Sequence, residues 1–136
     1  MALQTILEFA TRGRGTRDIT REVAEAVEAA GPGAGLAHVF VQHTSCSLII
    51  TENADADVRR DLDTILARLA PDGDPAYRHD AEGPDDMAAH VRNMLTGSGV
   101  TVPVNDGRLL LGTWQGIYLY EHRTSPHRRK VVVTVL

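Results

Sequence analysis

Apolar residues alternate with polar ones, or run together, in several short stretches rich in β-branched side chains, a pattern typical of β-strands. The turn signals "NDG" and "TSPH" separate the later stretches, which favours a mostly antiparallel meander in the tail. The predicted strands are "LQTILEFAT" (3–11), "LAHVFVQH" (36–43), "SLIITE" (47–52), "GVTVPV" (99–104), "RLLLGT" (108–113), "GIYLYEHR" (116–123) and "RRKVVVTVL" (128–136).

Three other segments carry apolar residues at helical spacing. The first begins near Asp18, which can cap a helix, and ends at Gly31; the second spans 55–69; the third follows Pro84 and ends at Gly97. Strands combined with three helices predict an α+β fold, a single domain over 1–136 whose largely antiparallel, twisted sheet has helices packed on it. The apolar stripes expected to face the core are Ile19, Val23, Ala26, Val27 and Ala30; Val58, Leu62, Ile65, Leu66 and Leu69; and Met87, Val91, Met94 and Leu95.

The totals exclude several classes of protein. The chain has 136 residues, 43% of them hydrophobic, and a net charge of -4, which favours neither a nucleic-acid-binding nor a membrane surface. No apolar stretch approaches the roughly 18 residues of a membrane span. The N-terminal stretch lacks the features of a secretion signal, and a lone cysteine cannot form an internal disulfide. We therefore expect a cytoplasmic protein.

Polar side chains end several of the apolar strand faces. Alternate strand residues share a face, so His43 lies on the same face as Val39 and Val41, and Glu52 lies on the same face as Leu48 and Ile50. Burying such groups alone costs several kcal/mol, so we expect them to meet one another or a ligand in one polar pocket at an edge of the sheet. The alternative is that each closes its strand at solvent. The same pattern is seen for Thr113, for Gln115 and Glu121 around Ile117 and Leu119, and for Arg129 before Val131, Val133 and Val135.

Histidines and carboxylates follow in the Pro/Gly/Asp-rich segment and the helix after it. His79 and Glu82 lie in the segment, and on the helix Asp86, His90 and Asn93 occupy adjacent angular positions. Three histidines, His43, His79 and His90, together with nearby acids can bind a divalent metal, Mg or Zn, with an open position for water or phosphate. They can also act as acid/base groups without a metal, or be structural. His38 alternates away from His43 and is interpreted as non-catalytic.

The hairpin at 121–130 is rich in basic residues. Arg129 differs from the others because its face is apolar, and a guanidinium there suits a phosphate or a carboxylate. The remaining basic residues are expected on a solvated turn tip: Arg123, Arg128 and Lys130.

Two further features invite a chemical reading that we reject. Cys46 follows shortly after His43, which suggests a nucleophile. Residues at such positions need not face one another, however, and nothing nearby in sequence would lower the thiol pKa. A packed small residue is therefore the better interpretation. The stretch "RGRGT" lacks the lysine and the strand-to-helix context of a phosphate-binding loop, so it is interpreted as a turn.

Four stretches together resemble the YjbQ-type family, which is linked to a secondary thiamine-phosphate synthase activity. They are "HTSCSLIITENADADV", "HDAEGPDDMAAH", "PVNDGRLLLGTWQGIYLYEHR" and "RRKVVVTV". The resemblance implies an α+β sandwich and a homotrimer with sites near subunit boundaries. The hairpin "HRTSPHRR" departs from the turn associated with the family.

The resemblance also implies an activity and a set of residues. The reaction would join a hydroxymethylpyrimidine diphosphate to a thiazole phosphate and release pyrophosphate, either as the main reaction or as a side activity of the enzyme. Two alternatives remain open: a non-catalytic anion- or metal-binding trimer, and a metal-dependent phosphate-ester hydrolase. The expected residues are His43, Glu52, Asp57, His90 and Glu121 for catalysis; Thr44, Ser45, Asn53, Glu82, Thr113, Gln115 and Arg129 for a small phosphorylated substrate; and His43, His79 and His90 for the metal.

Overall fold

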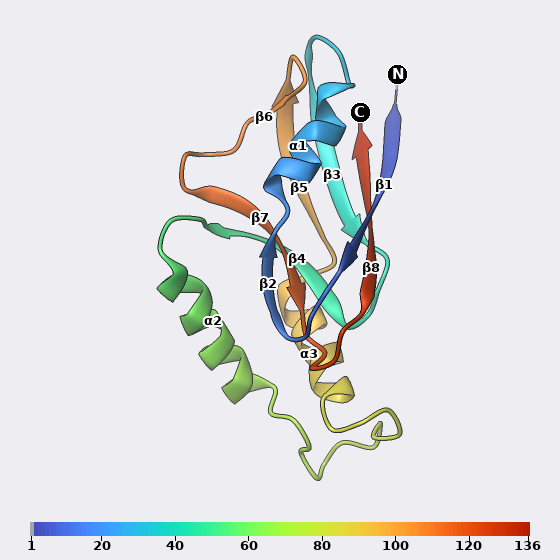
Figure 1. Cartoon of the computed structure of the whole chain (residues 1–136), viewed down its shortest axis with the longest axis vertical. Helices are drawn as coiled ribbons and strands as arrows, with labels where there is room; N and C mark the ends of the chain where they lie inside the picture. The colour runs from blue at the N-terminus through green and yellow to red at the C-terminus, as the bar shows by residue number, and fades with distance from the viewer. Residues whose placement is uncertain (1) are drawn as a thin grey trace.

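The computed structural model describes residues 2–136, which form two antiparallel sheets and three helices (Figure 1). The predicted α+β class is confirmed. Two boundaries differ from the prediction, because β2 lies in a segment expected to be a turn and "RLLLGT" contributes only a two-residue strand. Sheet A has the order β1 (Leu3–Ala10), β8 (Arg128–Val135), β3 (Ala34–Val41), β5 (Gly99–Asn105), β6 (Arg108–Leu109); sheet B has the order β2 (Gly15–Asp18), β7 (Gln115–Glu121), β4 (Cys46–Glu52).

The apolar core lies between the two sheets. Val39 and Val133, which are paired across β3 and β8, are buried on the inner face of sheet A, and Leu48 and Leu119 are paired and buried on sheet B. Helix α1 (Thr20–Glu28) covers one end of this core, and its predicted stripe is confirmed by the complete burial of Ile19, Val23 and Val27. Alternation along the strands thus gives each sheet one apolar and one more polar face.

Helix α2 (Ala56–Leu69) begins as predicted, because the Asp55 side chain accepts a hydrogen bond from the Asp57 amide at 2.9 Å. The prediction that its whole apolar stripe faces the core was wrong, because Leu66 is buried but Leu69 is 61% exposed. The helix meets sheet B partly through polar contacts, since the Tyr120 hydroxyl donates to Asp63. The outer face of sheet B is therefore a partly polar surface.

Helix α3 (Asp86–Thr96) also turns a different side inward from the one predicted. Met94 is 74% exposed, whereas Ala88, Ala89 and Arg92 are buried. Small alanines let the helix approach β4, and the Asn93 side chain donates to the Cys46 carbonyl at 2.6 Å. Specific hydrogen bonds and close approach thus outweighed the apolar stripe in setting the helix orientation.

Several turns gather where Cys46 of β4 pairs with Glu121 of β7, which we call the site end. The opposite end of the same ladder, where Glu52 pairs with Gln115, is the far end. At the site end the β1–β2 turn packs closely on the β7–β8 turn. Gly13 has a φ of +129°, and a Cβ there would lie 2.8 Å from the Thr124 carbonyl oxygen. No helix within residues 2–136 has the length and apolarity to cross a membrane.

Candidate functional site

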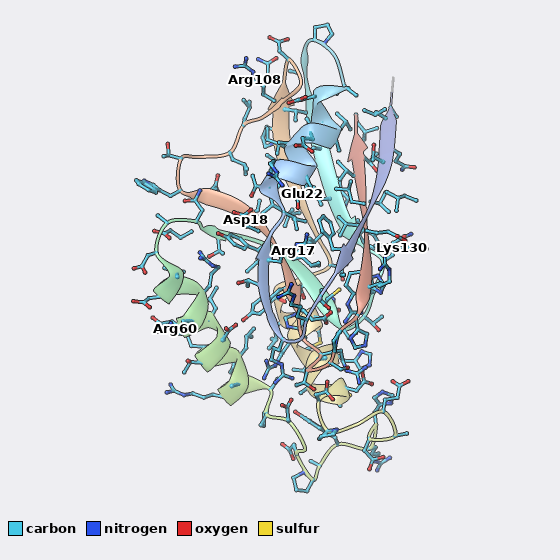
Figure 2. The ribbon with its side chains drawn as sticks, viewed as in Figure 1. Arg17, Asp18, Glu22, Arg60, Arg108 and Lys130 are labelled. Carbon is cyan, nitrogen blue, oxygen red and sulfur yellow. The ribbon has the colours of Figure 1, made fainter. Side chains whose placement is uncertain are left out.

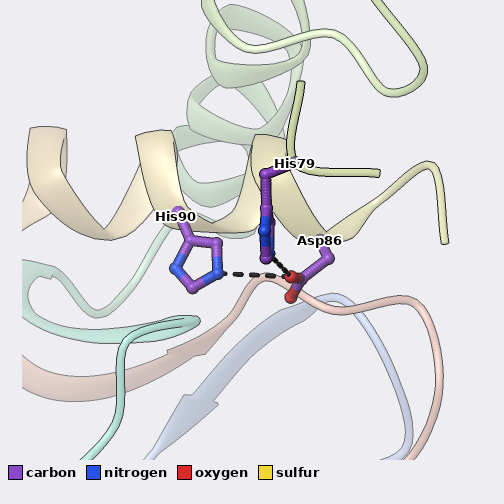
Figure 3. Close-up of side chains that lie close together, drawn as sticks. All are labelled: His79, Asp86 and His90. Atoms are coloured by element: carbon purple, nitrogen blue, oxygen red, sulfur yellow. Dashed lines mark hydrogen bonds and ion pairs between the residues drawn. The ribbon is translucent and has the colours of Figure 1, made fainter. Parts of the chain in front are cut away.

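Three side chains with metal-ligating atoms converge at the site end (Figure 3). The Asp86 carboxylate oxygen Oδ2 lies 2.6 Å from His79 Nε2 and 3.2 Å from His90 Nε2. The potential ligand atoms of these three residues all lie within 4.8 Å of one another. Helix periodicity places Asp86 and His90 one turn apart, and the preceding loop brings in His79. We call this group the His79–Asp86–His90 triad.

A backbone contact determines which nitrogen of His90 is free. Nδ1 of His90 lies 3.0 Å from the Thr44 carbonyl oxygen. A carbonyl only accepts, so Nδ1 carries a proton and Nε2 of the neutral ring presents a lone pair toward Asp86. Carbonyl or carboxylate partners of this kind commonly orient metal-ligating histidines.

Arg123 positions the carboxylates of this region. Its Nε donates to Asp85 at 2.9 Å, and its Nη1 lies 3.0 Å from Asp86 Oδ1. Burial raises the Asp85 pKa, but the Thr124 amide and Arg123 outweigh this effect and lower it to about 2. The prediction that Arg123 lies on a solvated turn tip was therefore wrong, because its side chain is only 15% exposed. Arg128, at 76% exposure, does lie at the surface as predicted.

A second buried cluster pairs two of the predicted strand-end residues. Arg129 donates from both Nε and Nη2 to the Glu121 carboxylate, and also to Ser45 Oγ at 3.0 Å. Thr11 adds a hydrogen bond to Glu121 at 2.7 Å. Burial raises the Glu121 pKa, but the hydrogen bonds from Arg129 and Thr11 have a larger opposite effect, so the pKa is lowered overall. The expectation that these buried groups meet one another is confirmed, and the Arg129 guanidinium is engaged by a carboxylate.

His43 lies outside the triad although it was predicted among the metal ligands. Its Nε2 accepts a hydrogen bond from the Lys130 amide at 2.8 Å. Burial, and then the positive charge of Arg129, lowers its pKa, which favours the neutral ring. The structure thus brings Asp86, rather than His43, to His79 and His90. The spacing of four between Asp86 and His90 was the signal that could have identified this ligand.

At the far end the implied site residues bind backbone groups of the turns before α2 and β7. Glu52 accepts from the amides of Ala54 and Asp55, at 2.9 and 2.6 Å, and Asn53 donates to the Thr113 carbonyl at 3.2 Å. Gln115 accepts from the Gly112 amide at 2.8 Å. Six residue steps along β4 separate the two ends by about 20 Å. Within one chain the prediction of a single polar pocket was therefore wrong.

The remaining implied residues are more exposed or contribute backbone atoms. The Asp57 side chain is 71% exposed and lies 3.7 Å from Arg60, while Glu82 is 65% exposed and 3.9 Å from His79. Thr113 is exposed in the turn before β7 and not on a strand face, because β6 ends at Leu109. Thr44 contributes its carbonyl to the triad.

Sequence reasoning missed the burial of His122, which was placed in the hairpin. The residue is fully buried, and burial, followed by the positive charge of Arg92, lowers its pKa to about 3. Its Nε2 lies 2.9 Å from Ser47 Oγ on β4. The sequence does place His122 next to Glu121, and therefore on the opposite face of the strand, which was the available signal for a separate environment. The prediction for Cys46 as a packed residue is confirmed, since it is fully buried in the core, and this burial raises its pKa to about 12.

Comparison with known proteins decides the family. The sequence profile described as "UPF0047 protein YjbQ-like" matches residues 5–136. The chain belongs to the YjbQ-like UPF0047 family. It is 48% identical over 132 residues to the UPF0047 protein sll1880 of Synechocystis, covering 97% of this chain and 90% of the relative. It is 40% identical over 136 residues to YjbQ of Salmonella typhimurium, covering 99% and 98%.

Solved structures of similar proteins agree with this fold. A conserved hypothetical protein from Thermus thermophilus, TT1486, superimposes with a TM-score of 0.83 at 40% identity, covering 94% of this chain and 97% of its own. A YjbQ/UPF0047 family protein from Clostridium acetobutylicum gives a TM-score of 0.84 at 38% identity, covering 96% and 99%. These names state no reaction. The family motif positions implied by the resemblance are thus divided in this chain between the site end and the far end.

Proposed function

We propose that this YjbQ-like protein is a divalent-metal-dependent enzyme acting on a phosphorylated small molecule, with the triad as its metal site. One observation carries the proposal: His90 Nε2 and Asp86 Oδ2 lie 3.2 Å apart, while the Thr44 carbonyl keeps the neutral-ring proton on His90 Nδ1. Two lone pairs facing each other at this distance need a cation between them, either a metal ion or a second proton on His90.

The donor set favours one class of metal. Two imidazoles and one carboxylate suit Zn²⁺ better than Mg²⁺, which prefers oxygen ligands and water. Three protein ligands are also the number found in catalytic zinc sites, which keep a further position open. A bound ion would supply positive charge to developing negative charge on a phosphate oxygen.

The reaction we propose is the one implied by the sequence resemblance: coupling of a hydroxymethylpyrimidine diphosphate with a thiazole phosphate. Its barrier is the departure of diphosphate, so hydrogen-bond donors are needed where charge develops. His43 offers one, because its Nε2 accepts from Lys130 and the ring proton of the neutral form must lie on Nδ1. A metal-dependent phosphate-ester hydrolase needs the same groups and is the second candidate.

Metal analysis followed by turnover assays tests the proposal. We expect stoichiometric zinc in purified protein, turnover that chelator abolishes, and loss of both in His90→Ala and Asp86→Asn. Asp61→Asn is the matched control for the carboxylate, since Asp61 is exposed on α2, away from the triad. Protein that binds no divalent ion, or that turns over equally with chelator, contradicts the metal-dependent enzyme. Metal binding without turnover of either substrate type favours the non-catalytic binder.

We also propose the homotrimer that the resemblance implies, with the outer face of sheet A in contact with other subunits. Val132 pairs with Ile6 on one side and Phe40 on the other, forming one apolar row across three strands. Ile6 is 62% and Phe40 44% exposed. Sedimentation should give three times the chain mass, and Phe40→Ser should shift it toward the monomer. A monomeric wild-type protein contradicts this arrangement.

A further inference from the structure

The β1–β2 turn and the start of β2 border a recess that the proposed metal site does not include. The recess has a volume of about 610 Å³ and lies where the edge strands β1 and β2 diverge beside β7. Three arginines from one short stretch, Arg12, Arg14 and Arg17, line it together with Thr11 and Glu121. We call it the arginine recess.

The charges of the arginine recess do not cancel. Glu121 is the only carboxylate in its lining, and Arg129 already binds that carboxylate through two nitrogens. Arg14 forms a bidentate pair with Asp72, with both distances 2.9 Å. Within residues 2–136, by contrast, Arg12 and Arg17 have no carboxylate partner. Arg12 and Arg17 therefore line the recess without an ion-pair partner among these residues.

The Arg17 guanidinium is held in place before any ligand arrives. It lies over the Phe9 ring, 4.9 Å from the centroid, and its Nη1 donates to the Ala10 carbonyl at 3.1 Å. Figure 2 shows Arg17 on β2, beside the strand β1 that provides these contacts. One guanidinium can make five hydrogen bonds, so most of its donors remain available. Holding a cation in this way reduces the ordering cost of binding an anion.

From these features we propose that the arginine recess is a separate binding site for a phosphate-bearing small molecule. Guanidinium groups present parallel donors that match two oxygens of a phosphate, and both Arg12 and Arg17 line this recess. The volume exceeds that of a single phosphate and leaves room for the rest of a small ligand. The site needs no metal, so it stands independently of the triad.

Calorimetric titration with inorganic pyrophosphate, on protein treated with chelator, tests the site. We expect the double variant Arg12→Gln/Arg17→Gln to bind pyrophosphate roughly tenfold more weakly or worse, because charge-assisted hydrogen bonds are lost. The matched control is Arg60→Gln/Arg108→Gln, which removes the same charge from exposed positions away from the recess (Figure 2). Its affinity should stay close to that of the wild type, and both double variants should remain folded, with a single cooperative thermal transition, although Arg17→Gln loses the contacts with Phe9 and Ala10.

The metal-site variant His90→Ala separates this inference from the proposed function. It should bind pyrophosphate as the wild type does in the presence of chelator, even where it has lost metal and turnover. Two results overturn the proposal: chelated wild-type protein that does not bind pyrophosphate, or an equal loss of affinity in the two double variants. The second result would mean that net charge, and not the recess, attracts the anion.

Discussion

The two ends of the β4–β7 ladder both carry clustered polar side chains, but these side chains have different partners. At the site end Glu121 of β7 and Arg129 of β8 bind each other, and the Asp86 side chain contacts His90, one helical turn further on, and His79 of the preceding loop. At the far end Glu52 and Gln115 bind amides within three residues of themselves. Polar groups that satisfy their own turn stabilise it. Ionisable side chains that converge on one another, with ligand atoms left to share, form a candidate site.

This difference also separates structural from chemical explanations of the family motif. Glu52 and Asn53 have backbone contacts that explain their presence in this chain without any ligand. The triad differs, because its carboxylate and imidazoles face one another and Nδ1 of His90 alone bonds a backbone group. Substitutions at the two ends should therefore differ in what they change.

The largest effect on stability is expected for Glu121→Ala at the site end. The substitution leaves Arg129, only 4% exposed, as a buried charge without its carboxylate, which costs about 3–5 kcal/mol. Urea unfolding measures the loss. The control is Glu8→Ala, which removes the partner of Arg128 at the surface, 3.6 Å away, and should cost about 1 kcal/mol or less. Equal losses in the two variants would contradict the buried pairing.

A pH-dependent effect is expected from His122. Its pKa is about 3 in the folded state, below the value of about 6.5 in an unfolded chain, so the unfolded state takes up the proton first as pH falls. Its stabilising contribution is therefore complete above pH ~6.5 and is lost on acidification, by about 2 kcal/mol between pH 7 and 5.

Unfolding of His122→Phe at pH 7 and pH 5 measures this contribution. The variant should show a flatter dependence than the wild type, whereas the exposed substitution Arg60→Gln, which leaves every histidine in place, should leave the slope unchanged. His43, whose pKa is also lowered, adds a residual slope of the same sign in all three proteins. An unaltered slope in His122→Phe would mean that His122 does not remain neutral when folded.

A smaller loss of stability is expected for Glu52→Ala at the far end. The variant loses the two amide contacts that hold the turn before α2, which should cost about 1 kcal/mol in the free energy of unfolding. Zinc affinity should not change, because the triad lies at the other end of the ladder. Activity lost while metal binding is retained would instead mean that the two ends meet across subunits of the proposed trimer.

The smallest effect is expected for Asp57→Asn. The carboxylate is 71% exposed and 3.7 Å from an exposed Arg60, so the free energy of unfolding should change by less than about 0.5 kcal/mol. Calorimetry with zinc should again match the wild type. A loss of zinc affinity would contradict the placement of the metal in the triad.

Much of the architecture could be predicted from local patterns. The strands of sheet A follow from alternation, since a β-strand turns every second residue to the same face. The burial of Glu121 and Arg129 was predictable from the same alternation, because each lies at the end of an apolar strand face. Helix α1 was also predictable, as its apolar residues form a single stripe that reaches the core.

Helix α3 shows where such patterns fail. Its apolar stripe predicted that Met94 and Leu95 are buried, yet both are exposed. Its orientation depends on contacts with β4 and the β7–β8 turn, which are distant in sequence. No local pattern contains that information.

Short periodicities and motifs in the sequence were enough to predict the three helices, most of the strands and the family to which the chain is similar, although β2 and the short length of β6 were not predicted. Only the tertiary structure decided that Asp86 replaces His43 beside His79 and His90, that Arg123 is an internal clamp, and that Glu52 and Gln115 lie at the opposite end. Residues far apart in a chain become neighbours through packing and strand register, and these are properties of the whole fold.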